Sequence, residues 1–292
     1  MVLASIDAVR NGRALYLLLA TTALSGLLLW ATRRALVAQA DAWAVLSAGA
    51  TFFVTFYGSN ATGIVLMDEA CGRAPRHPRD AIADALARGH RLLVVVLCVL
   101  LVMLALLAVV GGLLWVARLP ALGSSLLSLV VPAGVLVLGL AALLIVGVIG
   151  PLAAPAVWAG LPVAAVLRLL TAELRGRAPQ LLLLTAAVSL LSAAVAGLVS
   201  FALLAGGRAL LALAAVLVGL DLAPQALLGA LFGRGAPPGL SPHAAAAVTG
   251  GGVAFAFGLV LPGVVYLRGL CAVFLAVHPD PDAAASDLPP TS

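Results

Sequence analysis

Long uninterrupted runs of apolar residues recur along the 292-residue chain and limit what it can fold into. A helix needs about 20 apolar residues to cross a hydrocarbon core of about 30 Å, and several runs reach that length. Only helices and closed barrels satisfy every backbone hydrogen bond inside a bilayer. No segment of about ten residues alternates apolar and polar positions as barrel strands do. The sequence therefore predicts an all-α, polytopic integral membrane helical bundle.

Composition argues against a water-soluble domain. Hydrophobic residues make up 64% of the chain and charged residues 9%, whereas about a quarter of the residues in a soluble domain are charged. All 16 basic residues are arginine, which together with the abundance of Ala, Leu, Gly and Pro indicates a GC-rich bacterial genome. We attribute the net charge of +5 to membrane topology and expect no nucleic-acid partner.

Hydropathy and helix breakers divide the chain into a single transmembrane domain, residues 1–278, and a disordered tail, residues 279–292. The segment 209–232 is ambiguous because Asp221, Pro224 and Gln225 interrupt it, so we expect six or seven spans. The predicted spans are residues 14–31, 42–67, 92–117, 126–149, 181–204, the ambiguous 209–232, and 244–267.

The first apolar run could also be a signal peptide with a cleavage site after Ala38-Gln39-Ala40. Arg33 and Arg34 stand between the run and that site, and a second span follows almost at once, which favours a retained helix.

Arginine placement predicts the orientation of the bundle. The loop after the second span carries five arginines, which indicates the cytoplasmic side and places the N-terminus there too. They are Arg73, Arg76, Arg79, Arg88 and Arg91. Two cytoplasmic amphipathic helices are expected at the membrane interface, one beginning at Pro78 and one around Arg168. Six spans would leave the tail cytoplasmic, and seven would leave it outside.

The segment "APAVWAGLPVAAVLRLLTAELRGRAPQLLLLTAAV" carries a family resemblance. A proline after a span, a surface helix with an apolar-arginine centre and a Gly-Arg turn fall at Pro155, Val166-Leu167-Arg168 and Gly176-Arg177. In this the chain resembles the membrane domain found beside some glycerophosphodiester phosphodiesterases, and the YciC-type proteins of bacterial inner membranes. The resemblance implies an integral membrane protein. The chain has no Glu, Asp and His cluster to which the phosphodiesterase chemistry could be assigned.

Two stretches share the pattern ExxGRAP, at residues 69–75 and 173–179. Aligned by topology they are not equivalent, because the first follows a span and the second precedes one, so composition explains most of the match. Arginines of the two stretches remain candidates for binding anionic headgroups, at about 1 kcal/mol each. The candidate lipid-headgroup residues are Arg73, Arg76, Arg175 and Arg177.

Asp221 is the only acidic residue well inside an apolar segment and is a candidate intramembrane polar site. It could also cap a half-helix at the interface. Ser and Thr recur at helical spacing in two spans, as in Ser47, Thr51, Thr55 and Ser59, where they line a polar path or, more commonly, a close helix contact.

No nucleotide-binding, metalloprotease or nucleophile-elbow motif occurs, and the cysteines and histidines lack metal-ligand spacing. We therefore expect no catalytic residue, no cofactor and no metal. The expected function is a non-enzymatic structural, assembly or lipid-interacting role in the bacterial inner membrane. Membrane lipids are the expected partners, and a membrane protein or a second copy of the chain is a further candidate partner. The alternative is a small transporter or channel that uses Asp221.

Overall fold

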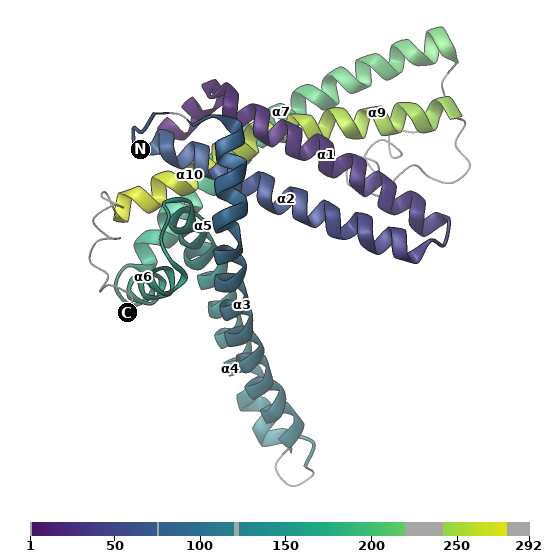
Figure 1. Cartoon of the computed structure of the whole chain (residues 1–292). Helices are drawn as coiled ribbons and strands as arrows, with labels where there is room; N and C mark the ends of the chain where they lie inside the picture. The colour runs from purple at the N-terminus through teal and green to yellow at the C-terminus, as the bar shows by residue number, and fades with distance from the viewer. Residues whose placement is uncertain (1, 75, 120–122, 220–241, 279–292) are drawn as a thin grey trace. The chain divides into compact units, whose positions relative to one another are not determined.

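The computed structural model describes residues 2–74, 76–119, 123–219 and 242–278, and all secondary structure in these ranges is helical (Figure 1). Within these ranges, six helices are long and apolar enough to cross a membrane, which confirms the all-α membrane class. The chain divides into two compact units. The first comprises Met1–Leu66 and Ser189–Arg268, and the second comprises Met67–Val188 and Gly269–Ser292.

The first unit begins with η1 (Val2–Arg10), α1 (Gly12–Val37) and most of α2 (Asp41–Ala70). Asn11 caps α1 by accepting hydrogen bonds from the backbone N–H groups of Arg13 and Ala14. Antiparallel pairing of α1 with α2 follows from two hydroxyl contacts, Ser25–Thr55 at 2.8 Å and Thr32–Ser47 at 2.9 Å.

A close approach of α1 and α2 occurs at Gly58. A Cβ atom there would lie 2.1 Å from the Thr21 hydroxyl oxygen, so only glycine fits against that side chain. Together with the cross-helix bonds of Ser47 and Thr55, this contact favours helix packing over a polar path as the role of the Ser and Thr stripe.

The rest of the first unit consists of the later part of α7 (Ala178–Val218), α9 (Pro242–Gly258) and the first part of α10 (Val260–Val277). Figure 1 shows α9 beside α1, with which it is in contact. Gly258 packs against Leu203, whose Cδ1 atom would lie 2.4 Å from an added Cβ. Ser192 donates to the Pro262 carbonyl at 3.0 Å, which joins α7 to α10.

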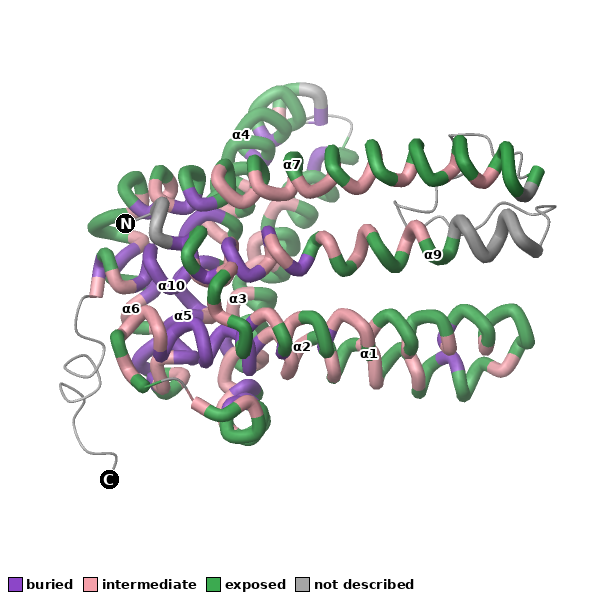
Figure 2. Tube along the Cα trace, turned by 90° about the horizontal axis from the view of Figure 1, so that it is seen from above, coloured by how far each residue is buried: buried purple, intermediate pink, exposed green. Residues whose placement is uncertain are grey.

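The second unit contains α3 (Pro78–Val116), α4 (Gly123–Leu144), a π-helical turn η2 (Ile145–Ile149), α5 (Gly150–Trp158) and α6 (Val163–Gly176). Figure 1 shows α3 and α4 running together, and the two helices are in contact. Buried residues gather around α5, which is buried almost throughout, and around the end of α10 (Figure 2). The arginine and aspartate network at the start of α3 belongs to the same unit as this apolar core.

The predicted division of residues 78–117 into an interfacial helix and a separate span is wrong, because α3 is one continuous helix from Pro78 to Val116. Proline is accommodated at the first turn, where its missing N–H would have no partner. Gly89 is the weakest helix former near the expected break, and one interior glycine costs only about 1 kcal/mol. Gly89 is buried in this unit, so packing offsets that cost.

The fourth span, predicted to end at residue 149, is not ended by the Gly150-Pro151 pair that follows. Pro151 cannot donate to the carbonyl four residues back, and the backbone responds by widening into η2, where the Gly150 N–H donates to Ile145. The helix then continues through α5 to Trp158, and the apolar stretch Ser125–Trp158 forms one candidate span.

Boundaries of the later spans also differ from the prediction. α7 continues beyond residue 204 to Val218, so it includes the first ten residues of the ambiguous segment 209–232. The glycines of α7 lower the stability of the helix but do not end it. The last span does not end at residue 267, because α10 extends to Val277 with Arg268 inside it. Pro262 has no N–H to donate to the Gly258 carbonyl, and the helix is interrupted at Leu259, between α9 and α10.

Candidate functional site

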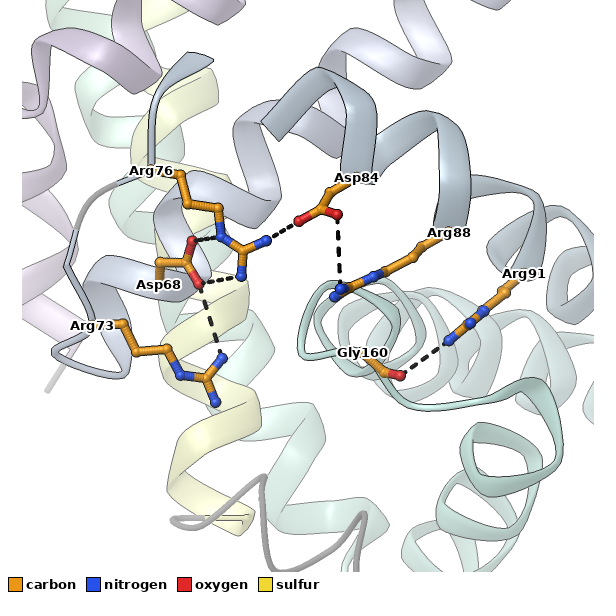
Figure 3. A network of polar contacts seen from close by, with 7 residues as sticks. All are labelled: Asp68, Arg73, Arg76, Asp84, Arg88, Arg91 and Gly160. Carbon is orange, nitrogen blue, oxygen red and sulfur yellow. Dashed lines mark hydrogen bonds and ion pairs between the residues drawn. The ribbon is translucent and has the colours of Figure 1, made fainter. Parts of the chain in front are cut away.

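A network of arginines and aspartates lies in the second unit where α2 ends and α3 begins. α2 stops at Ala70 because Gly72, with φ of +68°, adopts the left-handed conformation that closes a helix. The Arg73 N–H then donates to the Asp68 carbonyl at 2.8 Å and turns the chain back. The short connection to Pro78 brings Arg76 over the last turn of α2 (Figure 3).

Arg76 holds Asp68 with two points of contact. Its Nε lies 2.6 Å from Oδ2, and its Nη2 donates to Oδ1 at 3.0 Å. Its Nη1 contacts Asp84 on the second turn of α3. Asp68 is only 2% exposed, so this charge is stabilised by the paired guanidinium and not by water. Arg76 therefore binds the end of α2 to the start of α3.

Three further arginines extend the network (Figure 3). Arg73 lies 3.9 Å from Asp68, and Arg88 lies 3.8 Å from Asp84 one helical turn away. Arg91 donates to the Gly160 carbonyl at 3.1 Å, in the turn that follows α5. Gly160 has φ of +104°, a conformation that favours glycine. The network thus joins α2, α3 and the end of α5.

The network contains more arginines than aspartates. Arg73, Arg76 and Arg88 contact Asp68 and Asp84, whereas Arg91 is bound to the Gly160 carbonyl. Both carboxylates are engaged by guanidinium groups, so neither is placed to act as a general base. Among the described residues, no group of three or more His, Cys, Asp or Glu side chains could hold a metal ion. The arrangement is suited to fixing helix ends and to attracting anions.

α6 carries a second set of arginines. Its buried face consists of Ala165, Val166, Leu170 and Glu173, and its other faces expose Arg168 and Arg175, with Arg177 exposed at the helix end. α6 is thus amphipathic, as predicted for the second interfacial helix. Arg168 donates to the Ala164 carbonyl at 3.3 Å within its own helix. No ion pair within 4 Å joins these three guanidinium groups to a carboxylate among the described residues.

Glu173 is a buried carboxylate on the apolar face of α6. Its Oε1 lies 3.4 Å from Nε2 of His278, the residue that follows α10, and His278 packs against the Phe274 ring at 5.5 Å. Burial lowers the pKa of His278, nearby Glu173 raises it by a smaller amount, and Arg177 lowers it. The histidine is therefore neutral near pH 7, and the contact holds the end of α10 against α6.

The structure separates the four predicted headgroup arginines into two groups. Arg73 and Arg76 belong to the Asp68 network, whereas Arg175 and Arg177 lie exposed at the end of α6. The two ExxGRAP stretches are accordingly different, since Gly72 has positive φ and Gly176 does not. Asp221 lies outside the described residues.

Sequence reasoning missed Asp68, Asp84, Glu173 and His278 as partners in these contacts. One signal was present: Asp68 is a carboxylate in the last turn of an apolar span, and the arginines of the next loop begin five residues later. A charge at such a position requires a partner. The sequence around His278 does not indicate that this histidine contacts α6.

Within the described ranges, six helices that are long and apolar enough to span a membrane indicate a multi-pass helical membrane protein. No family model, curated protein or solved structure matches the chain. The resemblance to the phosphodiesterase-associated and YciC-type membrane domains therefore remains an expectation from the sequence.

Proposed function

We propose that this chain is a non-enzymatic protein of the bacterial inner membrane whose α6 arginines bind anionic phospholipid headgroups. One observation carries the proposal. Arg76 is engaged by two carboxylates, whereas Arg168, Arg175 and Arg177 are exposed on an amphipathic helix whose apolar face is buried. A guanidinium that is not paired with a carboxylate has its positive charge and its N–H donors available to bind an external phosphate. The headgroup role is thereby assigned to α6 and withdrawn from Arg76.

A six-span topology with both ends cytoplasmic accompanies this proposal. The Glu173–His278 contact supports it, because it places the end of α10 beside α6. The Arg91–Gly160 bond supports it too, because it places the turn before α6 beside the arginine-rich start of α3. With seven spans the end of α10 would lie across the membrane from α6. The positive-inside bias assigns the shared side to the cytoplasm.

Lipid retention tests the headgroup assignment. The full chain is purified in a neutral detergent from membranes that contain phosphatidylglycerol and phosphatidylethanolamine, and the bound lipids are measured by native mass spectrometry. We expect Arg175→Gln/Arg177→Gln to weaken retention of phosphatidylglycerol by about 30-fold, given about 1 kcal/mol for each of the two arginines.

The matched control is Arg13→Gln/Arg118→Gln, which removes the same charge from helix ends outside α6. Wild-type retention in this control is expected. Equal losses in the two double variants would mean that overall charge, and not α6, determines retention, and the assignment would be wrong.

A further inference from the structure

A shallow hollow lies at the tip of the α1–α2 hairpin in the first unit. It has a volume of about 420 Å³ and is lined by Arg34, Ala35, Val37, Ala38, Ala40 and Trp43. α2 is 30 residues long, or about 45 Å at 1.5 Å per residue, and this hollow lies at its first residues whereas Asp68 lies at its last turn. The hollow is therefore at the N-terminal end of α2.

The chemistry of the lining is that of a site for an amphiphile. Alanine, valine and tryptophan side chains form most of the wall, and Arg34 is the only charged residue in it. The Arg34 guanidinium lies over the Trp30 ring, 5.4 Å from its centroid, which holds the cation at the rim. Trp43 is 68% exposed and presents an apolar ring, and tryptophan is enriched where spanning helices meet lipid headgroups.

The position of these arginines adds a second argument. Arg33 and Arg34 are both exposed at the end of a span, on the side that the positive-inside bias normally leaves without basic residues. Asp41 begins α2 nearby but does not line the hollow, and the hairpin tip keeps a net positive charge of 2 − 1 = 1. A basic, aromatic and apolar hollow at a membrane boundary complements a phosphate attached to an acyl chain.

We propose that this hollow binds one anionic glycerophospholipid, with its phosphate on Arg34 and an acyl chain against Val37, Ala38 and Trp43. The site is independent of the α6 function, because it uses different helices and different arginines. Inorganic phosphate alone would pair with the Arg34 guanidinium but would leave the apolar side chains of the hollow in contact with water. A second copy of the chain would cover the wall but would bring no anion to Arg34.

Tryptophan quenching tests the site in the full chain. The protein in neutral detergent is titrated with phosphatidylglycerol that carries brominated acyl chains, which quench nearby indoles. We expect saturable quenching that Trp43→Phe reduces, and an apparent affinity that Arg34→Gln weakens by about fivefold or more. The matched control Arg118→Gln removes an exposed arginine from the turn after α3, and its titration should match wild type.

Several results would overturn the proposal. These are an equal loss of affinity in the Arg34 and Arg118 variants, equal quenching by brominated phosphatidylcholine, or displacement of the lipid by inorganic phosphate alone at the same concentration. A change from dimer to monomer in Trp43→Ala would identify a second copy as the occupant and would also reject the lipid. Because Arg34 and Trp43 are both exposed, the variants retain the α1–α2 packing, which thermal unfolding verifies.

Discussion

Asp68 and Arg76 form a two-point ion pair across the turn between α2 and α3, with Nε 2.6 Å from Oδ2 and Nη2 3.0 Å from Oδ1. The aspartate side chain is 3% exposed and the arginine side chain 27% exposed. A nearly dry carboxylate at the end of an apolar helix is costly unless it is paired. The pair therefore sets the path by which the chain leaves α2 and enters α3.

Breaking this pair should destabilise the protein. Asp68→Asn keeps the size of the side chain but removes the charge, and Arg76 then loses its two-point partner, at a cost of about 1 to 3 kcal/mol. Thermal unfolding in neutral detergent measures the change. The control Arg73→Gln removes a contact of 3.9 Å whose arginine is one-third exposed, and it should cost less than about 1 kcal/mol. Equal stability of Asp68→Asn and wild type would show that the pair does not contribute.

The close contact of α1 with α2 gives a second prediction. Gly58→Ala would place a Cβ atom 2.1 Å from the Thr21 hydroxyl oxygen, so the helices must separate or Thr21 must rotate away from its own bond to Leu17. We expect a loss of about 1 to 3 kcal/mol, as for other overpacked contacts.

Gly49→Ala is the matched substitution on the same helix. Nothing lies within 4 Å of its Cβ position, so the change should leave stability equal or slightly higher. If the two alanine variants unfold at the same temperature, the α1–α2 contact at Gly58 is not as close as described.

The Glu173–His278 contact predicts a dependence of stability on pH. Burial, the largest effect, lowers the pKa of His278 in the folded protein below its ordinary value of 6.5. Because the folded state binds this proton more weakly than the unfolded state, stability is full above about pH 6.5 and falls as the pH drops through the lowered pKa.

His278→Gln should flatten this dependence, and unfolding temperatures between about pH 8 and pH 5 measure it. The variant His90→Gln, at an exposed position of α3, serves as the control and should retain the wild-type slope. An identical slope in wild type and His278→Gln would reject the role assigned to this histidine.

Apolar periodicity and length predicted the class of fold well, because every span needs about 20 apolar residues to cross a hydrocarbon core. Breaker residues predicted boundaries poorly. Pro151 follows the predicted end of the fourth span, but the helix continues past it through a π-helical turn. The predicted interfacial helix from Pro78 and the predicted span from residue 92 form one helix, in which Gly89 is buried. Both outcomes depend on neighbours that a local pattern does not contain.

The candidate site was predicted in its residue types but not in its pairing. Arginines at helix ends are visible in the sequence, whereas the choice of Arg76 for Asp68 depends on how the turn at Gly72 folds back. The Glu173–His278 contact joins residues that are far apart in the chain, and only the packing of α10 against α6 reveals it.

The central proposal is that the chain crosses the membrane six times, which would place α6, the start of α3 and the end of α10 on one side. Single cysteines at Ala74, Leu119 and Ser292, in a chain whose native cysteines Cys71, Cys98 and Cys271 are replaced by alanine, report this directly. A membrane-impermeant thiol reagent is applied to sealed inverted and right-side-out vesicles. We predict that Ala74→Cys and Ser292→Cys react from the cytoplasmic side and Leu119→Cys from the opposite side. Reaction of Ser292→Cys together with Leu119→Cys would contradict the six-span account.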